Sequence, residues 1–174
     1  MAGMIPYEEI IQSTEKKTVI FSSYVETLDT CADILSDIGY EYIGVYGNST
    51  SNLTEAVSKF EKNESVNPLI ATYASLSTAV PLVMADTMIL INPPFRDYVL
   101  QQTIARIHRI GADTQIRVFH FTMDTDKEPN IASRNLDILK WSREQVAQIL
   151  DISESTEITE EETIAVEELA TEEI

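Results

Sequence analysis

The sequence predicts an α/β domain in which a mainly parallel β-sheet is covered by helices on both faces. Short runs rich in β-branched and aromatic residues alternate along the chain with longer stretches of helical periodicity. Several of the short runs are almost continuously apolar, which is typical of strands that are buried on both faces. Parallel strands also need crossover connections, usually helices, so both observations indicate the same fold class.

The composition provides enough apolar residues for one domain with a proper core. Of the 174 residues, 44% are hydrophobic, and the formal net charge is −17. Nine glutamates and no basic residue lie in 153–174, which leaves −8 on the rest of the chain. We expect an amphipathic leader at 1–15, one folded domain at 16–150 and an acidic tail at 151–174 that is disordered or weakly helical. Such an acidic chain has no general basic footprint, so any contact with nucleic acid must be local or shared with a partner.

The first predicted strand–helix unit follows the leader. A β-rich run at 17–21 ends at two serines, and apolar residues at helical spacing come next. Ser23 and Glu26 have the spacing of a capping box, which would start this helix, and Gly39 would end it. Cys31 lies among the apolar positions of the helix, where we expect a small core residue.

The remaining elements continue the alternation. Each predicted strand is a β-rich run bounded by glycine, proline or asparagine, and each predicted helix has apolar residues at helical spacing. The further strands are expected at 42–46, 69–72, 87–91 and 116–121. The further helices are expected from about residue 52, at 97–109 and at 131–150.

Small or polar residues stand at or just after the predicted strand ends. They are Ser22, Ser23, Gly47, Thr72 and Asn92. The carboxyl ends of parallel strands meet at one edge of a sheet, and ligands of such sheets bind there. We therefore expect these residues to line one edge, together with the start of the helix at 97–109.

The helix at 97–109 carries an unusual cluster of functional side chains. At about 100° per residue, Gln102, Arg106 and Arg109 fall on one face. The opposite face carries three apolar side chains, those of Leu100, Ile104 and Ile107. Two guanidinium groups directed at one place indicate a shared anion, most naturally phosphate. The alternative is a solvated basic face on an amphipathic helix.

The same helical spacing places His108 on the apolar side, where we expect a hydrogen-bonded structural histidine. Two histidines and one cysteine are too few for a zinc cluster, so we expect no metal site in this chain. There is no apolar run long enough to span a membrane and no signal peptide, so we expect an intracellular, soluble protein.

Residues 102–111 resemble motif VI of superfamily 2 helicases, in the form found in the Swi/Snf-like DNA translocase branch. Other segments agree with that family in order and spacing. Residues 18–23 are similar to motif IV, 45–49 to the next strand and its glycine turn, 71–86 to motif V, and 89–94 to the strand and proline loop before motif VI. The resemblance covers 16–150 and implies the second of two RecA-like lobes, a three-layer domain of the P-loop NTPase type.

The resemblance also implies that ATP is bound between two lobes. The first lobe would supply the phosphate loop and the carboxylates that hold Mg²⁺, and the second would supply arginine fingers. Arg106 and Arg109 would then be catalytic, while Gln102 and the motif V position Ala79 would be at the ATP. Ala79 stands where the family usually has glycine. The chain contains no Gly-x-x-x-x-Gly-Lys-Ser/Thr loop, so we expect it to be inactive alone and to need an N-terminal lobe in cis or in trans.

The implied nucleic-acid contacts are hydroxyl groups at the strand ends, those of Ser22, Ser23, Thr72 and Thr78. They would bind phosphates of DNA, in preference to RNA, and would not read its sequence. Each has a structural alternative. Ser23 can simply cap its helix, and the two threonines can simply satisfy the backbone of their loops.

The sequence thus predicts the second lobe of an ATP-dependent DNA helicase or translocase. The alternative is a stand-alone, degenerate lobe that acts as a non-catalytic binding or regulatory module. The acidic body, the tail of nine glutamates and the glycine-poor motif V motivate this alternative. In it, the tail would mimic nucleic acid in the basic groove of a partner lobe. An unrelated α/β nucleotide-binding or signalling domain would leave the Gln-Arg-His-Arg cluster unexplained.

Overall fold

The computed structural model describes residues 7–47, 53–76, 80–108, 115–121 and 131–150. Five parallel strands form one sheet in the order β2-β3-β1-β4-β5. The strands are β1 (Thr18–Ser22), β2 (Glu41–Val45), β3 (Val66–Thr72), β4 (Thr87–Leu90) and β5 (Arg117–His120). The helices are α1 (Tyr7–Gln12), α2 (Val25–Asp37), α3 (Leu53–Lys62), α4 (Asp97–Ile107) and α5 (Ile131–Leu150).

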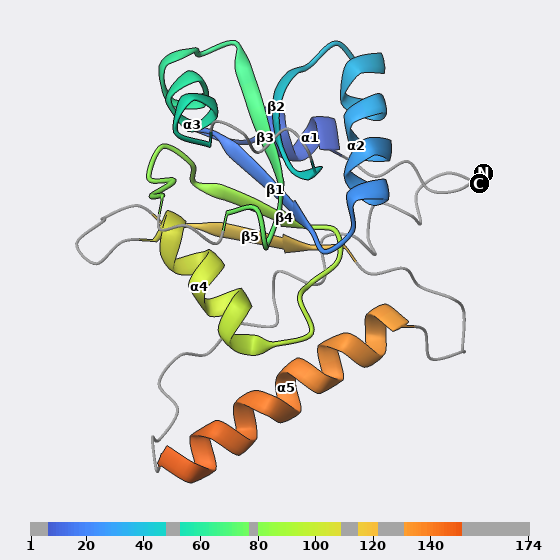
Figure 1. The fold of residues 1–174 in the computed structure, drawn as a ribbon, viewed down its shortest axis with the longest axis vertical. Helices are drawn as coiled ribbons and strands as arrows, with labels where there is room; N and C mark the ends of the chain where they lie inside the picture. Colours follow the sequence, from blue (N-terminus) through green and yellow to red (C-terminus); the bar gives the residue numbers. More distant parts are fainter. Residues whose placement is uncertain (1–6, 48–52, 77–79, 109–114, 122–130, 151–174) are drawn as a thin grey trace.

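Helices cover both faces of the sheet, as Figure 1 shows, with α1 and α2 on one side and α3 and α4 on the other. Alternation along β1 explains how one strand serves two cores, because successive side chains point to opposite faces. Val19 and Phe21 pack in the core with α3 and α4, whereas Ile20 packs with α1 and α2. The predicted α/β fold with a parallel sheet and helices on both faces is confirmed.

Residues 7–12 of the expected leader form α1, which packs on the sheet. Tyr7, Ile10 and Ile11 have the i, i+3, i+4 spacing of one helix face, and all three are buried. The Tyr7 ring also meets Phe121 edge-on, with 5.6 Å between the ring centroids. The leader therefore contributes side chains to the same core as α2.

The beginning of α2 differs from the expected capping box. The N-cap residue is Tyr24, without a side-chain cap, so Ser23 lies one residue before the cap position. The neighbouring Ser22 Oγ instead accepts a hydrogen bond from the Tyr24 N–H at 3.0 Å. The capping-box prediction is wrong because the serine turn delays the helix by one residue. The predicted stop at Gly39 is confirmed, since that glycine has φ +83°, a value that L side chains rarely adopt.

Lys17 joins three elements at the amino edge of the sheet. Its Nζ donates to the carbonyl oxygen of Phe60, to that of Asn63 at 2.6 Å and to that of Val66 at 3.1 Å. It also lies 4.8 Å from the centroid of the Phe60 ring. The last carbonyls of a helix have no intrahelical partner, so this ammonium satisfies the end of α3 and ties it to β1 and β3. Burial lowers the pKa of Lys17.

We expect Lys17→Met to lower the free energy of unfolding by about 1–3 kcal/mol, because carbonyls that now accept from an ammonium would lose their donor. Urea unfolding followed by circular dichroism measures the change. Lys62→Met, at an exposed lysine in the last turn of α3, is the matched control and should change stability by less than about 0.5 kcal/mol. Equal effects of the two substitutions would contradict the role given to Lys17.

Candidate nucleotide and nucleic-acid interface

Three of the predicted strand-end residues, Ser22, Thr72 and Asn92, meet at the carboxyl edge of the sheet. Ser22 and Thr72 are register partners at the ends of β1 and β3. The Ser22 hydroxyl donates to Asn92 Oδ1 at 2.9 Å, which joins the end of β1 to the loop after β4. The chain leaves β1 toward α2 on one face and leaves β4 toward α4 on the other. This edge is therefore a switch point of the kind where α/β sheets bind ligands.

The hydroxyl groups at this edge differ in accessibility. Ser22 is fully buried, and its hydroxyl is engaged with Tyr24 and Asn92. Thr72 is also buried, and its Oγ1 accepts from the Ser75 N–H at 3.2 Å and lies 2.6 Å from Ser75 Oγ. Ser23, by contrast, is exposed. Thr78 lies outside the described residues.

A pocket of about 300 Å³ opens at the same edge. Three loops line it, which follow β1, β3 and β4, and α4 closes one side. Its lining residues are Ser23, Thr72, Tyr73, Ala74, Pro94, Phe95, Arg96 and Val99. The expected nucleic-acid residues Ser23 and Thr72 are thus brought into one pocket.

The helix α4 has the two faces that its spacing predicted. Leu100 and Ile107 are buried and Ile104 is half-buried in the core, whereas Gln102 is exposed. Arg106 is half-buried, and burial lowers the pKa of its guanidinium, which stays charged because arginine is not deprotonated in proteins. Arg109 and Ala79 lie outside the described residues.

The end of α4 meets the loop before β4. The Arg106 carbonyl oxygen accepts from the Leu82 N–H at 2.9 Å. At the end of the same loop, the Asp86 N–H donates to the carbonyl oxygen of Lys17 at 3.1 Å, and Lys17 directly precedes β1. The segments that resemble motifs V and VI therefore come together at the amino edge of the sheet.

The structure separates the two groups of predicted site residues. The helix α4 starts beside the pocket at the carboxyl edge, which Val99 helps to line, and its last turn meets the loop before β4 at the amino edge through Arg106. At 1.5 Å per residue, the path from Asp97 to Arg106 is about 14 Å long. Ser23 and Thr72 therefore lie at one end of α4, and Arg106 lies at the other.

His108 does not lie on the apolar side of the helix. The helix ends at Ile107, and His108 is its C-cap residue with an extended backbone, φ −90° and ψ 96°. Its side chain is exposed. The prediction of a structural histidine is wrong because helical periodicity was extended one residue beyond the real helix.

Sequence reasoning missed Phe95 and Arg96, which line the pocket. Both lie in the loop between β4 and α4, and Arg96 is the N-cap residue of α4. The N-terminal part of α4 is fixed by α5, because Arg143 makes an ion pair with Asp97 at 2.9 Å. Asn135 of α5 also donates to the Pro93 carbonyl oxygen at 2.6 Å. Phe95 and Arg96 follow a predicted strand, and that position alone could have marked them as candidate site residues. The sequence does not show that their side chains are exposed.

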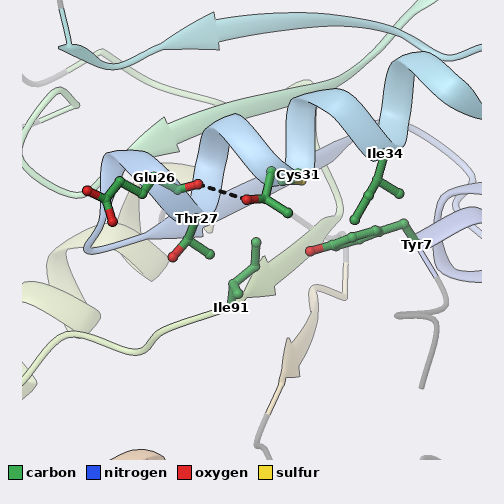
Figure 2. Close-up of a pocket in the computed structure, with 7 residues that line it drawn as sticks. Tyr7, Glu26, Thr27, Cys31, Ile34 and Ile91 are labelled. Carbon is green, nitrogen blue, oxygen red and sulfur yellow. Dashed lines mark hydrogen bonds between the residues drawn. The ribbon is translucent and has the colours of Figure 1, made fainter. Parts of the chain in front are cut away.

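A second pocket, of about 260 Å³, lies between α1 and α2. Figure 2 shows Tyr7 reaching under α2 toward Ile91, with Cys31 and Ile34 above it. Cys31 is 1% exposed, which confirms the expected core position. Burial raises the pKa of its thiol to about 11, against a smaller opposite effect of a hydrogen bond with Tyr7. This thiol is therefore protonated and a poor nucleophile.

Among the described residues there is no group of three or more His, Cys, Asp or Glu side chains that could hold a metal ion. No helix in the described ranges is both long and apolar enough to cross a membrane.

Comparison with known proteins identifies the fold family. Residues 4–111 match the family model of the helicase conserved C-terminal domain. The chain belongs to this family. The predicted kinship of this lobe with the Swi/Snf-like branch is confirmed, because its relatives include ISWI and SWI/SNF-related proteins.

Two curated relatives illustrate this kinship. The lobe is 26% identical over 121 residues to a probable ATP-dependent helicase of Plasmodium falciparum. This alignment covers 69% of the chain and 6% of that protein. It is 28% identical over 127 residues to the ISWI chromatin-remodeling complex ATPase CHR17 of Arabidopsis thaliana. That alignment covers 71% of the chain and 12% of that protein. The lobe thus spans only a small part of these relatives.

A solved structure agrees on the fold. The crystal structure of the C-terminal part of the Fun30 ATPase domain superposes with a TM-score of 0.60 at 16% identity, covering 81% of this chain and 51% of that one. The predicted RecA-like architecture is therefore confirmed.

We expect Cys31 to react slowly with iodoacetamide at pH 8. A pKa about two units above that of an ordinary thiol leaves roughly a hundredfold less thiolate, and burial slows access further. Mass spectrometry of the folded chain should show labelling at least about a hundredfold slower than in urea. Cys31→Ser gives the background, and equal rates in the folded and unfolded chain would contradict the buried thiol.

Proposed function

We propose that this chain is the second RecA-like lobe of an ATP-dependent DNA helicase or translocase. The observation that carries the proposal is the family match over 4–111, together with the meeting of the segments that resemble motifs V and VI at the amino edge of the sheet. In this proposal a first lobe, in cis or in trans, holds ATP against that edge. The carboxylates of the first lobe hold Mg²⁺.

Arg106 and Arg109 act as arginine fingers on the ATP phosphates. Gln102 orients them, and the backbone at Ala79 approaches the nucleotide. Phosphoryl transfer depends mostly on positioning and on neutralising the charge of the transferred group, so a guanidinium suits this role. Arg106 is half-buried, which supports the proposal. Burial restrains the side chain, and the lower local dielectric strengthens the electrostatic attraction between its guanidinium and a phosphate.

The carboxyl edge contacts phosphates of the DNA strand. Of the predicted nucleic-acid residues that the structure describes, Ser23 has the exposed hydroxyl group. Thr78 is proposed as a phosphate contact from its motif position alone. Ser22 and Thr72 are buried and bonded to neighbours, so their contribution is to fix the loops on which exposed donors are presented. Closure of the two lobes on ATP would then move this edge relative to the DNA.

In a complete two-lobed protein, we expect Arg106→Ala and Arg109→Ala each to lower the ATPase rate by about 10³–10⁵-fold, because each removes charge stabilisation of the transition state. ATP affinity should change little, since the first lobe holds most of the nucleotide. Steady-state ATPase assays and equilibrium binding of a fluorescent ATP analogue separate the two effects.

Arg134→Ala, at an exposed arginine of α5, is the control for these variants and should keep normal turnover. Near-normal turnover in the Arg109 variant would remove it from the catalytic set, and the same result for Arg106 would remove that residue.

A second function is favoured by the charge of the chain, in which 153–174 hold nine glutamates and no basic residue. In this alternative the lobe is a regulatory module whose tail occupies a partner lobe's basic groove. We expect deletion of 153–174 to raise the DNA affinity of the two-lobed protein severalfold at low salt and to steepen its salt dependence. Anisotropy titrations at several salt concentrations measure both, and unchanged values would contradict autoinhibition by the tail.

A further inference from the structure

The helix α5 places little apolar surface in the core. Among its described side chains, Leu139 is the buried apolar one, at 4% exposure, and it packs in the core with α3 and α4. Ile138 and Trp141 on the same helix are 47% and 62% exposed. Burial of apolar surface is the main force that holds elements together. We therefore expect α5 to depend on its polar contacts to stay in place.

The polar contacts of α5 hold the beginning of α4. Asn135 donates to the Pro93 carbonyl oxygen, and Arg143 pairs with Asp97 at 2.9 Å. Both side chains also carry an unpaired atom, because Asn135 Oδ1 and Arg143 Nε are buried without a hydrogen-bond partner in the described part of the chain. Buried polar atoms without partners cost free energy, so this docking is easily reversed.

His120 adds a titratable group to this contact from the sheet. It is the last residue of β5 and lies on the same sheet face as Val118, which packs against the core with α4. Its Nδ1 is buried and has no hydrogen-bond partner among the described residues. Burial lowers the pKa of this imidazole, and the positive charge of Arg143 lowers it further. The neutral imidazole therefore fits this environment, and the imidazolium does not.

Protonation of His120 would add a second positive charge near Arg143. The described part of α4 offers one carboxylate here, that of Asp97, which already pairs with Arg143. Both ring nitrogens of an imidazolium are donors, so Nδ1 would become a buried N–H without an acceptor. The neighbouring strand β4 has no charged residue. The other described charged side chains of α5 are exposed, namely Arg134, Asp137, Lys140 and Glu144.

The second charged residue of β5 does not take part in this contact. Arg117 lies at the other end of the strand, where its guanidinium donates to the Ser13 carbonyl oxygen at 2.7 Å. The charges that act on His120 from the packed elements are therefore those of Arg143 and, through its pair, Asp97.

We propose that the docking of α5 is acid-sensitive, and that protonation of His120 detaches α5 from the core and from the start of α4. Detachment separates the positive charges of His120 and Arg143 and gives the imidazolium access to water. The loop before α4 then loses its bond from Asn135, and Asp97 loses its partner. Acid thereby loosens the beginning of α4, independently of the roles proposed for ATP and DNA.

The docked helix is expected to lose stability as the pH falls. His120 has its ordinary pKa, near 6.5, when α5 is detached, and a lower pKa when α5 is docked. Docking is therefore fully stable above about pH 6.5 and weakens below it. Between pH 7.5 and pH 5, the equilibrium constant for detachment should rise by up to about 30-fold.

Hydrogen exchange followed by mass spectrometry tests this proposal on the 174-residue chain. Protection factors, corrected for the intrinsic exchange rate at each pH, are compared at pH 7.5 and pH 5. The amides of α5 should lose up to about 30-fold of their protection, whereas those of the central strands β1 and β4 should keep theirs. Equal protection of α5 at the two pH values, or an equal loss in the strands, would overturn the proposal.

The two histidines of the chain provide a variant and its matched control. His120→Gln keeps a neutral polar side chain, so α5 should be equally protected at the two pH values. His108→Gln changes the exposed histidine at the end of α4 and should keep the wild-type loss. The protection of β1 and β4 shows whether each variant is folded. The wild-type loss in a folded His120→Gln chain would contradict the role of His120.

Arg143→Met tests the repulsion separately. It should lower the protection of α5 at both pH values, because the pair with Asp97 is lost. It should also reduce the ratio between the two protection factors, because the pKa of His120 would rise toward its ordinary value without the nearby cation. A purely structural role for Arg143 would leave that ratio unchanged, and this outcome would contradict the proposed repulsion.

Discussion

The central strand β1 is the constraint on which the rest of the structure depends. All five of its residues are buried, and it pairs with β3 on one side and β4 on the other. Its side chains must fill a core on each face, so both faces need helices. The strand then ends at Ser22, whose hydroxyl joins the loops after β1 and β4. A buried hydroxyl group at the end of β1 would destabilise the sheet unless it both donated to Asn92 and accepted from Tyr24, as the Ser22 hydroxyl does.

Much of the fold could be predicted because a parallel sheet leaves a simple signal. Strands buried on both faces must be apolar throughout, and the runs at 17–21 and 87–91 match β1 and β4 to within one residue at each end. The third strand was less well predicted. Pro68 suggested a start at residue 69, whereas β3 begins at Val66, where it pairs with Glu41. Pairing with a neighbour, and not local preference, sets where this strand begins.

The ends of the helices and the exposure of single side chains could not be read from the sequence. Ser23 lies one residue before the N-cap of α2, and His108 is the C-cap residue of α4. An error of one residue in a helix boundary therefore turned Ser23 into a predicted cap and His108 into a predicted core residue. Gln102 and Arg106 were predicted on the outward face because helical geometry is periodic. Phe95 escaped notice because an aromatic residue in a short loop is as consistent with burial as with exposure, and tertiary packing decides which applies.

The clamping of α4 at both ends has a mechanical consequence. Its first residue is joined to α5 through the Asp97–Arg143 pair, and its last turn is joined to the loop before β4 through the Arg106 carbonyl. A hydrogen-bonded helix of eleven residues is stiff over this length. A displacement of the loop that holds Arg96 would therefore be passed to the Arg106 end of α4, with little bending of the helix between them. The buried contacts of Leu100 and Ile107 hold the helix against the core along its length.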